Sequence, residues 1–174
     1  MIVTNIKRYN NFIICYGSLR GGDVIYHSNN DMTGFHTFFY GIRGDGYLYC
    51  PEKNEKIHPA TMDRYIENIS RFYNMPLEYH AISENNLDYL MLIKRKDVSI
   101  VELKDLWLPT GEQKIIKIKK DQTIICFEGE AQIVHNNGSN TIKDLNSVTS
   151  SKDQNINVKS LNNAKLVIVT CERE

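Results

Sequence analysis

The stretch IICFEGEAQIV, residues 124–134, joins two apolar runs through a tight Gly-Glu turn. Residues 39–49, FYGIRGDGYLY, follow the same plan with Gly-Asp at the turn. In both halves an Asn-Asn pair and a further apolar run come next, at residues 85–93 and 162–170. A pattern that occurs twice in the same order indicates that the chain contains two similar structural units. We therefore predict two related halves.

Short apolar segments account for most of the chain. They are rich in Val, Ile, Phe and Tyr and are bounded by Gly, Asn and Asp, which is typical of β-strands. These segments are residues 11–16, 23–27, 35–42, 47–50, 79–82, 89–94, 113–118, 123–127, 131–135, 158–159 and 164–171. The Asn-Gly pair at 137–138 is a strong hairpin signal, because both residues tolerate positive φ. Many short strands with frequent turns favour an all-β sandwich or barrel.

One segment departs from the strand pattern. Within residues 59–73 the apolar side chains recur at intervals of three and four, and Pro59 suits a first helical turn. We predict an amphipathic helix inserted in the first half, with no counterpart in the second. The predicted domains are residues 1–97, which contain this helix, and residues 98–174.

Composition excludes several classes of function. The 21 Lys and Arg residues balance the 21 Asp and Glu residues, so no concentrated positive charge is available for a nucleic acid or an anionic membrane. No apolar run is long enough to span a membrane, and the N-terminus lacks a secretory signal pattern. The four cysteines are widely scattered, so we expect them to be reduced and structural.

The order of a Gly-acidic turn within FEGEAQIV, an Asn-Gly turn, a polar strand and a closing apolar strand resembles the cupin superfamily. Cupins are small antiparallel jelly-roll barrels, and a tandem copy is a bicupin. The resemblance covers residues 113–170 well and residues 23–93 less well. It implies an all-β fold of two tandem antiparallel jelly-roll barrels, with one helix inserted in the first.

Cupin enzymes resemble one another in a His-x-His pair followed by a Glu ahead of the Gly turn, and in one further His. Alternate strand residues point into the barrel, so His-x-His presents two imidazoles to one metal. In the second half the matching positions hold Ile116, Ile118, Gln122 and, for the last His, Asn157. The resemblance thus implies a second barrel without a metal site.

The first half retains more of the ligand types. Its matching positions hold Asp31, Thr33 and Thr37, and the further His matches His80. A β-bulge would turn His36 inward, and His36, His80 and Asp31 or His27 would then resemble a facial triad. The alternative is that His36 is a packing residue among its aromatic neighbours.

Tyrosines are concentrated in the same half. A tyrosine combines an apolar body with a polar tip, which suits interfaces and sugar-like ligands. Tyr40, Tyr47 and Tyr49 are therefore the candidate ligand-binding residues, although filling of the barrel would use some of them.

The prediction from sequence is a non-enzymatic structural or ligand-binding protein that self-associates and needs no cofactor. We expect it in the cytoplasm, with a virion as the alternative, because the abundance of Asn, Ile, Lys and Tyr suggests an AT-rich genome such as that of many phages. We expect neither nucleic acid nor membrane as a partner. The alternative function is a metal-dependent dioxygenase, isomerase or epimerase, with a divalent metal in the first barrel and a small polar or sugar-like substrate.

Overall fold

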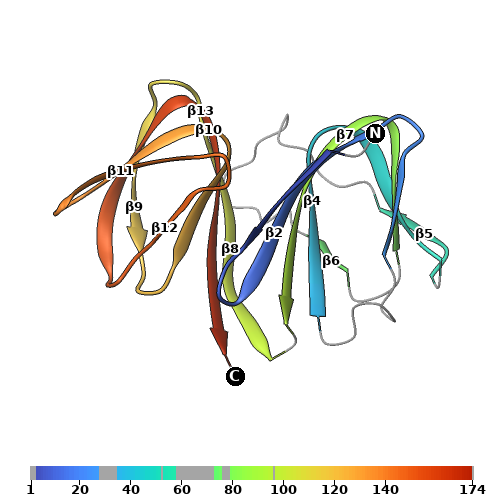
Figure 1. Ribbon diagram of the computed structural model, residues 1–174, viewed down its shortest axis with the longest axis horizontal. Helices are drawn as coiled ribbons and strands as arrows, with labels where there is room; N and C mark the ends of the chain where they lie inside the picture. Colours follow the sequence, from blue (N-terminus) through green and yellow to red (C-terminus); the bar gives the residue numbers. More distant parts are fainter. Residues whose placement is uncertain are drawn as a thin grey trace. The chain divides into compact units, whose positions relative to one another are not determined.

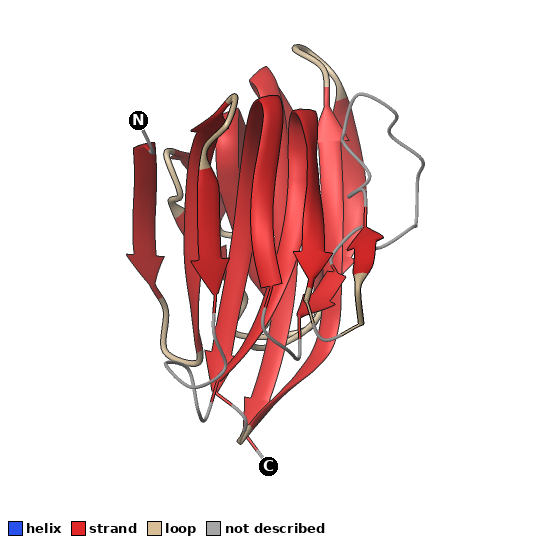
Figure 2. Ribbon diagram, turned by 90° about the vertical axis from the view of Figure 1, so that its right-hand side faces the viewer, coloured by secondary structure: helices blue, strands red, loops and turns tan. Residues whose placement is uncertain are grey.

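The computed structural model describes residues 3–27, 35–51, 53–57, 73–75, 79–95 and 97–173. The chain divides into two compact units, which meet in the sequence between Ser99 and Ile100. Figure 2 shows strands and loops, and no helix, in the part of the chain that is described. Accordingly, no helix of these residues is long and apolar enough to cross a membrane.

The first unit contains one seven-stranded sheet. Its strands are β1 (Val3–Arg8), β2 (Phe12–Arg20), β3 (Val24–His27), β4 (Phe35–Cys50), β5 (Glu55–Ile57), β6 (Tyr73–Met75) and β7 (Tyr79–Arg95). The order is β1-β2-β7-β4-β5, with β3 paired to β7 and β6 paired to β4. The central strand β7 pairs antiparallel with three others, so it organises this unit.

The second unit contains one six-stranded sheet. Its strands are β8 (Val98–Leu108), β9 (Gln113–Ile118), β10 (Thr123–His135), β11 (Gly138–Lys143), β12 (Ser147–Thr149) and β13 (Gln154–Arg173). The order is β11-β10-β13-β8, with β12 paired to β10 and β9 paired to β13. Alternate side chains of these strands enclose an aliphatic core that includes Ile124, Ala131, Val158 and Leu166.

The predicted fold class is corrected on one point, the inserted helix. The structure is all-β, with two antiparallel sheets and no helix among the described residues. Residues 59–72 of the predicted helix lie outside the described residues, and Tyr73, its last residue, begins strand β6. Tyr73 pairs with Phe39 of β4, so cross-strand pairing overrides the helical spacing of a short apolar segment.

The two Gly-acidic segments are also not turns between separate strands. Residues 35–42 and 47–50 are parts of the single strand β4, and residues 123–135 form the single strand β10. Gly44 and Gly129 have positive φ values of 95° and 75°, and both strand pairings shift register beside them. These positions are therefore β-bulges, which bend a strand without ending it. Figure 1 shows β4 with β7, and β10 with β13, curving over within each unit.

The repeated Asn-Asn pairs lie on the partner strand at the same bends. A Cβ atom on Gly44 would lie 1.6 Å from the carbonyl oxygen of Asn86, and one on Gly129 would lie 2.1 Å from that of Asn162. Glycine is required where two backbones approach this closely. The two sequence repeats are thus the two sides of one bent strand pair, present once in each unit.

Candidate functional site

The three tyrosines that are predicted to contact a ligand differ in how far they are exposed to solvent. Tyr40 is fully buried, whereas Tyr47 and Tyr49 are half-buried. The ammonium group of Lys56 lies 4.3 Å from the ring centre of Tyr47, and the hydroxyl of Tyr49 donates to Asn54 Oδ1 at 3.1 Å. Tyr40 therefore acts first as a core residue. A ligand contact by any of the three stays a prediction.

The predicted metal ligands of the first unit are located by their backbone only. His27 pairs with Tyr79, His80 lies between Tyr26 and Tyr49, and His36 pairs with Lys94. No strand pairing makes His36 and His80 direct partners within the described residues. Asp31 lies outside the part that is described, as do the side chains of these three histidines. The metal set stays a prediction.

Two of the second-unit positions that the sequence resemblance matches to metal ligands hold aliphatic side chains. Ile118 is buried in the aliphatic core, and Ile116 packs against it. Gln122 is also buried, and its side-chain amide donates to Glu102 Oε2 at 2.7 Å and to Thr170 Oγ1 at 3.0 Å. This environment does not fit a metal ion, because Ile116 and Ile118 offer no donor atom, and the other two matching positions, Gln122 and Asn157, offer only neutral amides.

Glu102 is the carboxylate that this buried amide contacts. An ion pair with Lys104, aided by the Gln122 hydrogen bond, lowers the pKa of the Glu102 carboxyl below its usual 4.5. A carboxyl whose pKa is lower in the folded state stabilises the fold above its unfolded pKa, and this contribution is lost as the pH falls through the folded pKa.

We expect Glu102→Gln to lower the free energy of unfolding at pH 7 by about 1 kcal/mol. The difference from the unmodified protein should shrink as the pH falls below 4.5. Urea denaturation between pH 3 and pH 7 measures this, with Glu112→Gln in the exposed turn before β9 as the control. If Glu102→Gln lowers the free energy of unfolding by the same amount at pH 3 as at pH 7, the contribution of Glu102 is not electrostatic.

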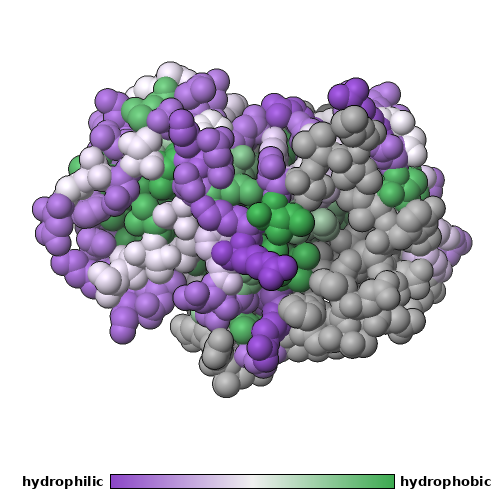
Figure 3. Space-filling view, viewed as in Figure 1, coloured by the Kyte–Doolittle hydropathy of each residue, from purple (hydrophilic) through white to green (hydrophobic). Residues whose placement is uncertain are grey.

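A pocket of about 180 Å³ lies within the second unit. Its apolar lining comes from the ends of β9, β10 and β13 and from β12, namely Ile118, Ile133, Ile156 and Val148. Its polar lining comes from β10 to β13 and the loops between them, namely His135, Asn137, Asn140, Thr149, Ser150, Ser151, Lys152 and Gln154. An apolar base with a few convergent polar groups is the usual character of a small-molecule site. In Figure 3 hydrophobic side chains show between polar ones on the face of this unit that is in view.

His135 forms part of the pocket wall. The backbone N–H of Asn137 donates to its Nδ1 at 3.3 Å, and the side-chain amide of Asn140 lies 3.1 Å from its Nε2. Nδ1 accepts the bond from Asn137, so the neutral ring carries its proton on Nε2, which lies beside the side chain of Asn140. Sequence reasoning did not select His135, because it sought metal ligands in the first half. The signal was the alternation along β10, in which His135 follows buried Ile133 on the same side of the strand.

A more open depression of about 460 Å³ occurs in the first unit, lined by Ser18, Arg20, Arg43 and Asp88 among others. Two of the three charged side chains in its lining, Arg43 and Asp88, pair with each other. Asp88 accepts hydrogen bonds from the hydroxyl of Ser18 at 2.6 Å and from Nε of Arg43 at 2.5 Å. The pocket of the second unit, with its apolar and polar lining, is therefore the better candidate site.

No protein-family model and no curated protein matches the sequence. Solved structures do match the fold. A cupin 2 conserved barrel domain protein from Leptotrichia buccalis has a TM-score of 0.55 and 15% identity, over 99% of this chain and 89% of its own. The protein YhaK from Escherichia coli has a TM-score of 0.67 and 7% identity, over 96% and 92%. The bacterial pirin YhhW from Escherichia coli, in complex with nickel(II), has a TM-score of 0.60 and 10% identity, over 97% and 98%. At these identities the likeness concerns the fold alone.

Proposed function

This chain has the cupin fold, and from that premise we propose that it is a small-molecule-binding protein whose pocket lies in the second unit and uses no metal there. The observation that carries the proposal is the lining of that pocket, in which Ile118, Ile133 and Ile156 form an apolar base beneath polar groups. Such a lining binds a small compound by apolar contact and hydrogen bonding.

The test is a titration of isotopically labelled protein followed by the methyl NMR signals of its isoleucines. The probes are glucose, 1-butanol, butyrate and butylamine. We expect at least one probe to shift the methyl signals of Ile118, Ile133 and Ile156 saturably, while Ile124, which does not line the pocket, changes little.

Two tryptophan variants make the test specific. Ser151→Trp places a large side chain at the pocket lining and should abolish the shifts. Asn155→Trp places the same side chain at an exposed position of β13 outside the lining and should leave them intact. If no probe gives a saturable shift of these methyl signals, the proposal fails.

The metalloenzyme alternative is supported by the histidines of the first half and by the nickel(II) complex of the pirin. In it, His36 and His80 with Asp31 or His27 hold a divalent metal. Metal analysis of untagged protein separates the two functions. Stoichiometric metal that is lost in the His36→Ala, His80→Ala double variant would favour the enzyme.

Self-association, in solution or in an assembly such as a virion, remains part of the proposal. It is supported by exposed Ile6 on β1, which ends the sheet order of the first unit, and by exposed Ile115 on β9. The division of the chain into two compact units between Ser99 and Ile100 supports the further proposal that these units are tandem barrels. A solution mass of 20.1 kDa, that of one chain, would contradict self-association.

A further inference from the structure

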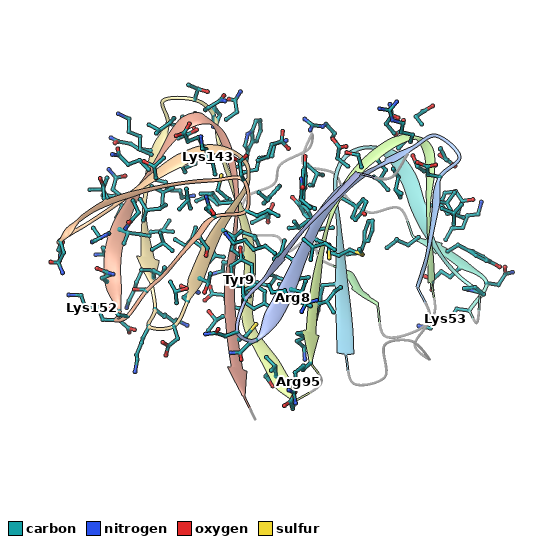
Figure 4. All side chains as sticks on the ribbon, viewed as in Figure 1. Arg8, Tyr9, Lys53, Arg95, Lys143 and Lys152 are labelled. Carbon is teal, nitrogen blue, oxygen red and sulfur yellow. The ribbon has the colours of Figure 1, made fainter. Side chains whose placement is uncertain are left out.

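The charge of the second-unit pocket restricts what it can bind. Among the described residues that line it, Lys152 is the one side chain with a permanent charge, and none is Asp or Glu. Lys152 is exposed and lies in the loop between β12 and β13, where Figure 4 labels it. A pocket with a cation and no acid favours an anionic ligand over a cationic one.

The loop that carries Lys152 is held by hydrogen bonds. The hydroxyl of Ser150 donates to the carbonyl oxygen of Lys152 at 2.6 Å, and the side-chain amide of Gln154 donates to the Ser150 hydroxyl at 3.0 Å. These bonds span the residues on both sides of Lys152. They fix its backbone at the pocket lining, which lowers the entropic cost of using its side chain in binding.

The nearest acid in the sequence is bound elsewhere. The carboxylate of Asp153 accepts a hydrogen bond from the backbone N–H of Lys120 at 2.8 Å. It is therefore held against the turn between β9 and β10 and does not line the pocket. This contact also brings Lys120, a second exposed lysine, beside the same loop.

The rest of the pocket lining includes apolar side chains. Ile118, Ile133 and Ile156 are nearly fully buried and belong to the aliphatic core of the unit. Hydrocarbon is favoured where a ligand meets them, because a polar group there would lose its hydrogen bonds to water. The volume of about 180 Å³ is smaller than that of pockets for drug-sized ligands.

We propose that the ligand is a small amphipathic carboxylate, whose acid group meets Lys152 and whose short hydrocarbon chain lies on the three isoleucines. This inference rests on the proposed function, because it names the ligand class of the same pocket. A charge-assisted hydrogen bond to the ammonium group selects the acid, and the apolar base selects against fully hydroxylated compounds.

The test compares matched four-carbon probes by methyl NMR titration of the full chain. We expect butyrate to bind roughly tenfold more tightly than 1-butanol, and butylamine to bind more weakly than either. Lys152→Gln should remove this preference by weakening butyrate roughly tenfold while leaving 1-butanol unchanged. Lys159→Gln removes the same charge from an exposed position of β13 outside the lining, and it should change neither affinity.

The outcomes separate this inference from the proposed function. If titration of the pocket methyl signals shows that 1-butanol or glucose binds as tightly as butyrate does, the pocket binds small molecules but the carboxylate inference is wrong. An equal loss of butyrate affinity in Lys152→Gln and Lys159→Gln would also overturn it, because the preference for butyrate would then come from the overall charge of the protein. If no probe binds, both proposals fail together.

Discussion

Replacing Gly129 by alanine is expected to cost the second unit about 2–5 kcal/mol of folding free energy. Two effects add. A residue with a Cβ atom in the left-handed region, at a φ of 75°, costs roughly 1–2 kcal/mol. The Cβ atom would also lie 2.1 Å from the carbonyl oxygen of Asn162 and 2.4 Å from that of Asn163, and pushing packed backbone apart costs roughly another 1–3 kcal/mol.

Gly111 provides the matched control in the same unit. It has a similar φ of 84°, but nothing lies within 4 Å of a Cβ atom built there. Gly111→Ala should therefore cost only the conformational part, about 1–2 kcal/mol. Thermal unfolding followed by circular dichroism measures the difference, and a fall in Tm of roughly 10–20 °C is expected for Gly129→Ala. Equal falls in Tm for the two variants would show that the close approach of the two backbones at Gly129 does not contribute to stability.

The same comparison applies to the first unit. Gly44 has a φ of 95°, and its Cβ atom would lie 1.6 Å from the Asn86 carbonyl oxygen, whereas Gly22, at 84°, has open space around it. Gly44→Ala should therefore destabilise at least as strongly as Gly129→Ala, with Gly22→Ala as its mild control. Agreement between the two units would establish that the repeated motif has one physical role.

Replacing Tyr40 by alanine is expected to destabilise the first unit by about 3–5 kcal/mol, because it empties a fully buried aromatic site. Tyr40 lies on β4 opposite Leu90, itself fully buried. Tyr47→Ala is the control. Tyr47 is half-buried and loses chiefly its contact with Lys56, so about 1 kcal/mol is expected.

Urea unfolding of both variants distinguishes a packing role for Tyr40 from a binding role. A binding tyrosine at a surface would change the affinity for a ligand and leave the free energy of unfolding almost unaltered. If Tyr40→Ala unfolds at the same urea concentration as the unmodified protein, the packing interpretation is wrong.

Much of the fold could be predicted from the sequence because strands have a local signature. The predicted strand 113–118 coincides with β9, and the predicted strands 123–127 and 131–135 both lie within the single strand β10, since alternation and β-branched residues act within a strand. The resemblance to cupins through FEGEAQIV is confirmed at the level of the fold. The inserted helix was wrong at Tyr73, where pairing with β4 determines the conformation.

The candidate site could not be located in the same way. Ile118, His135 and Lys152 are far apart in the chain, and none of them belongs to a motif that signals a ligand site. They line one pocket because β9 pairs with β13 and β10 pairs with β11 in particular registers. Register depends on contacts between distant residues, which local patterns do not specify.

The two halves illustrate the division between sequence and tertiary structure. The sequence by itself determined that a Gly-acidic segment and an Asn-Asn pair occur twice in the same order, because both are short and local. Only the tertiary structure decided that Gly129 faces Asn162, and Gly44 faces Asn86, across a bend between two long strands. The reason is physical. A glycine followed by an acid is equally compatible with a hairpin turn and with a bulge, and it is the approach of the second strand that selects the bulge.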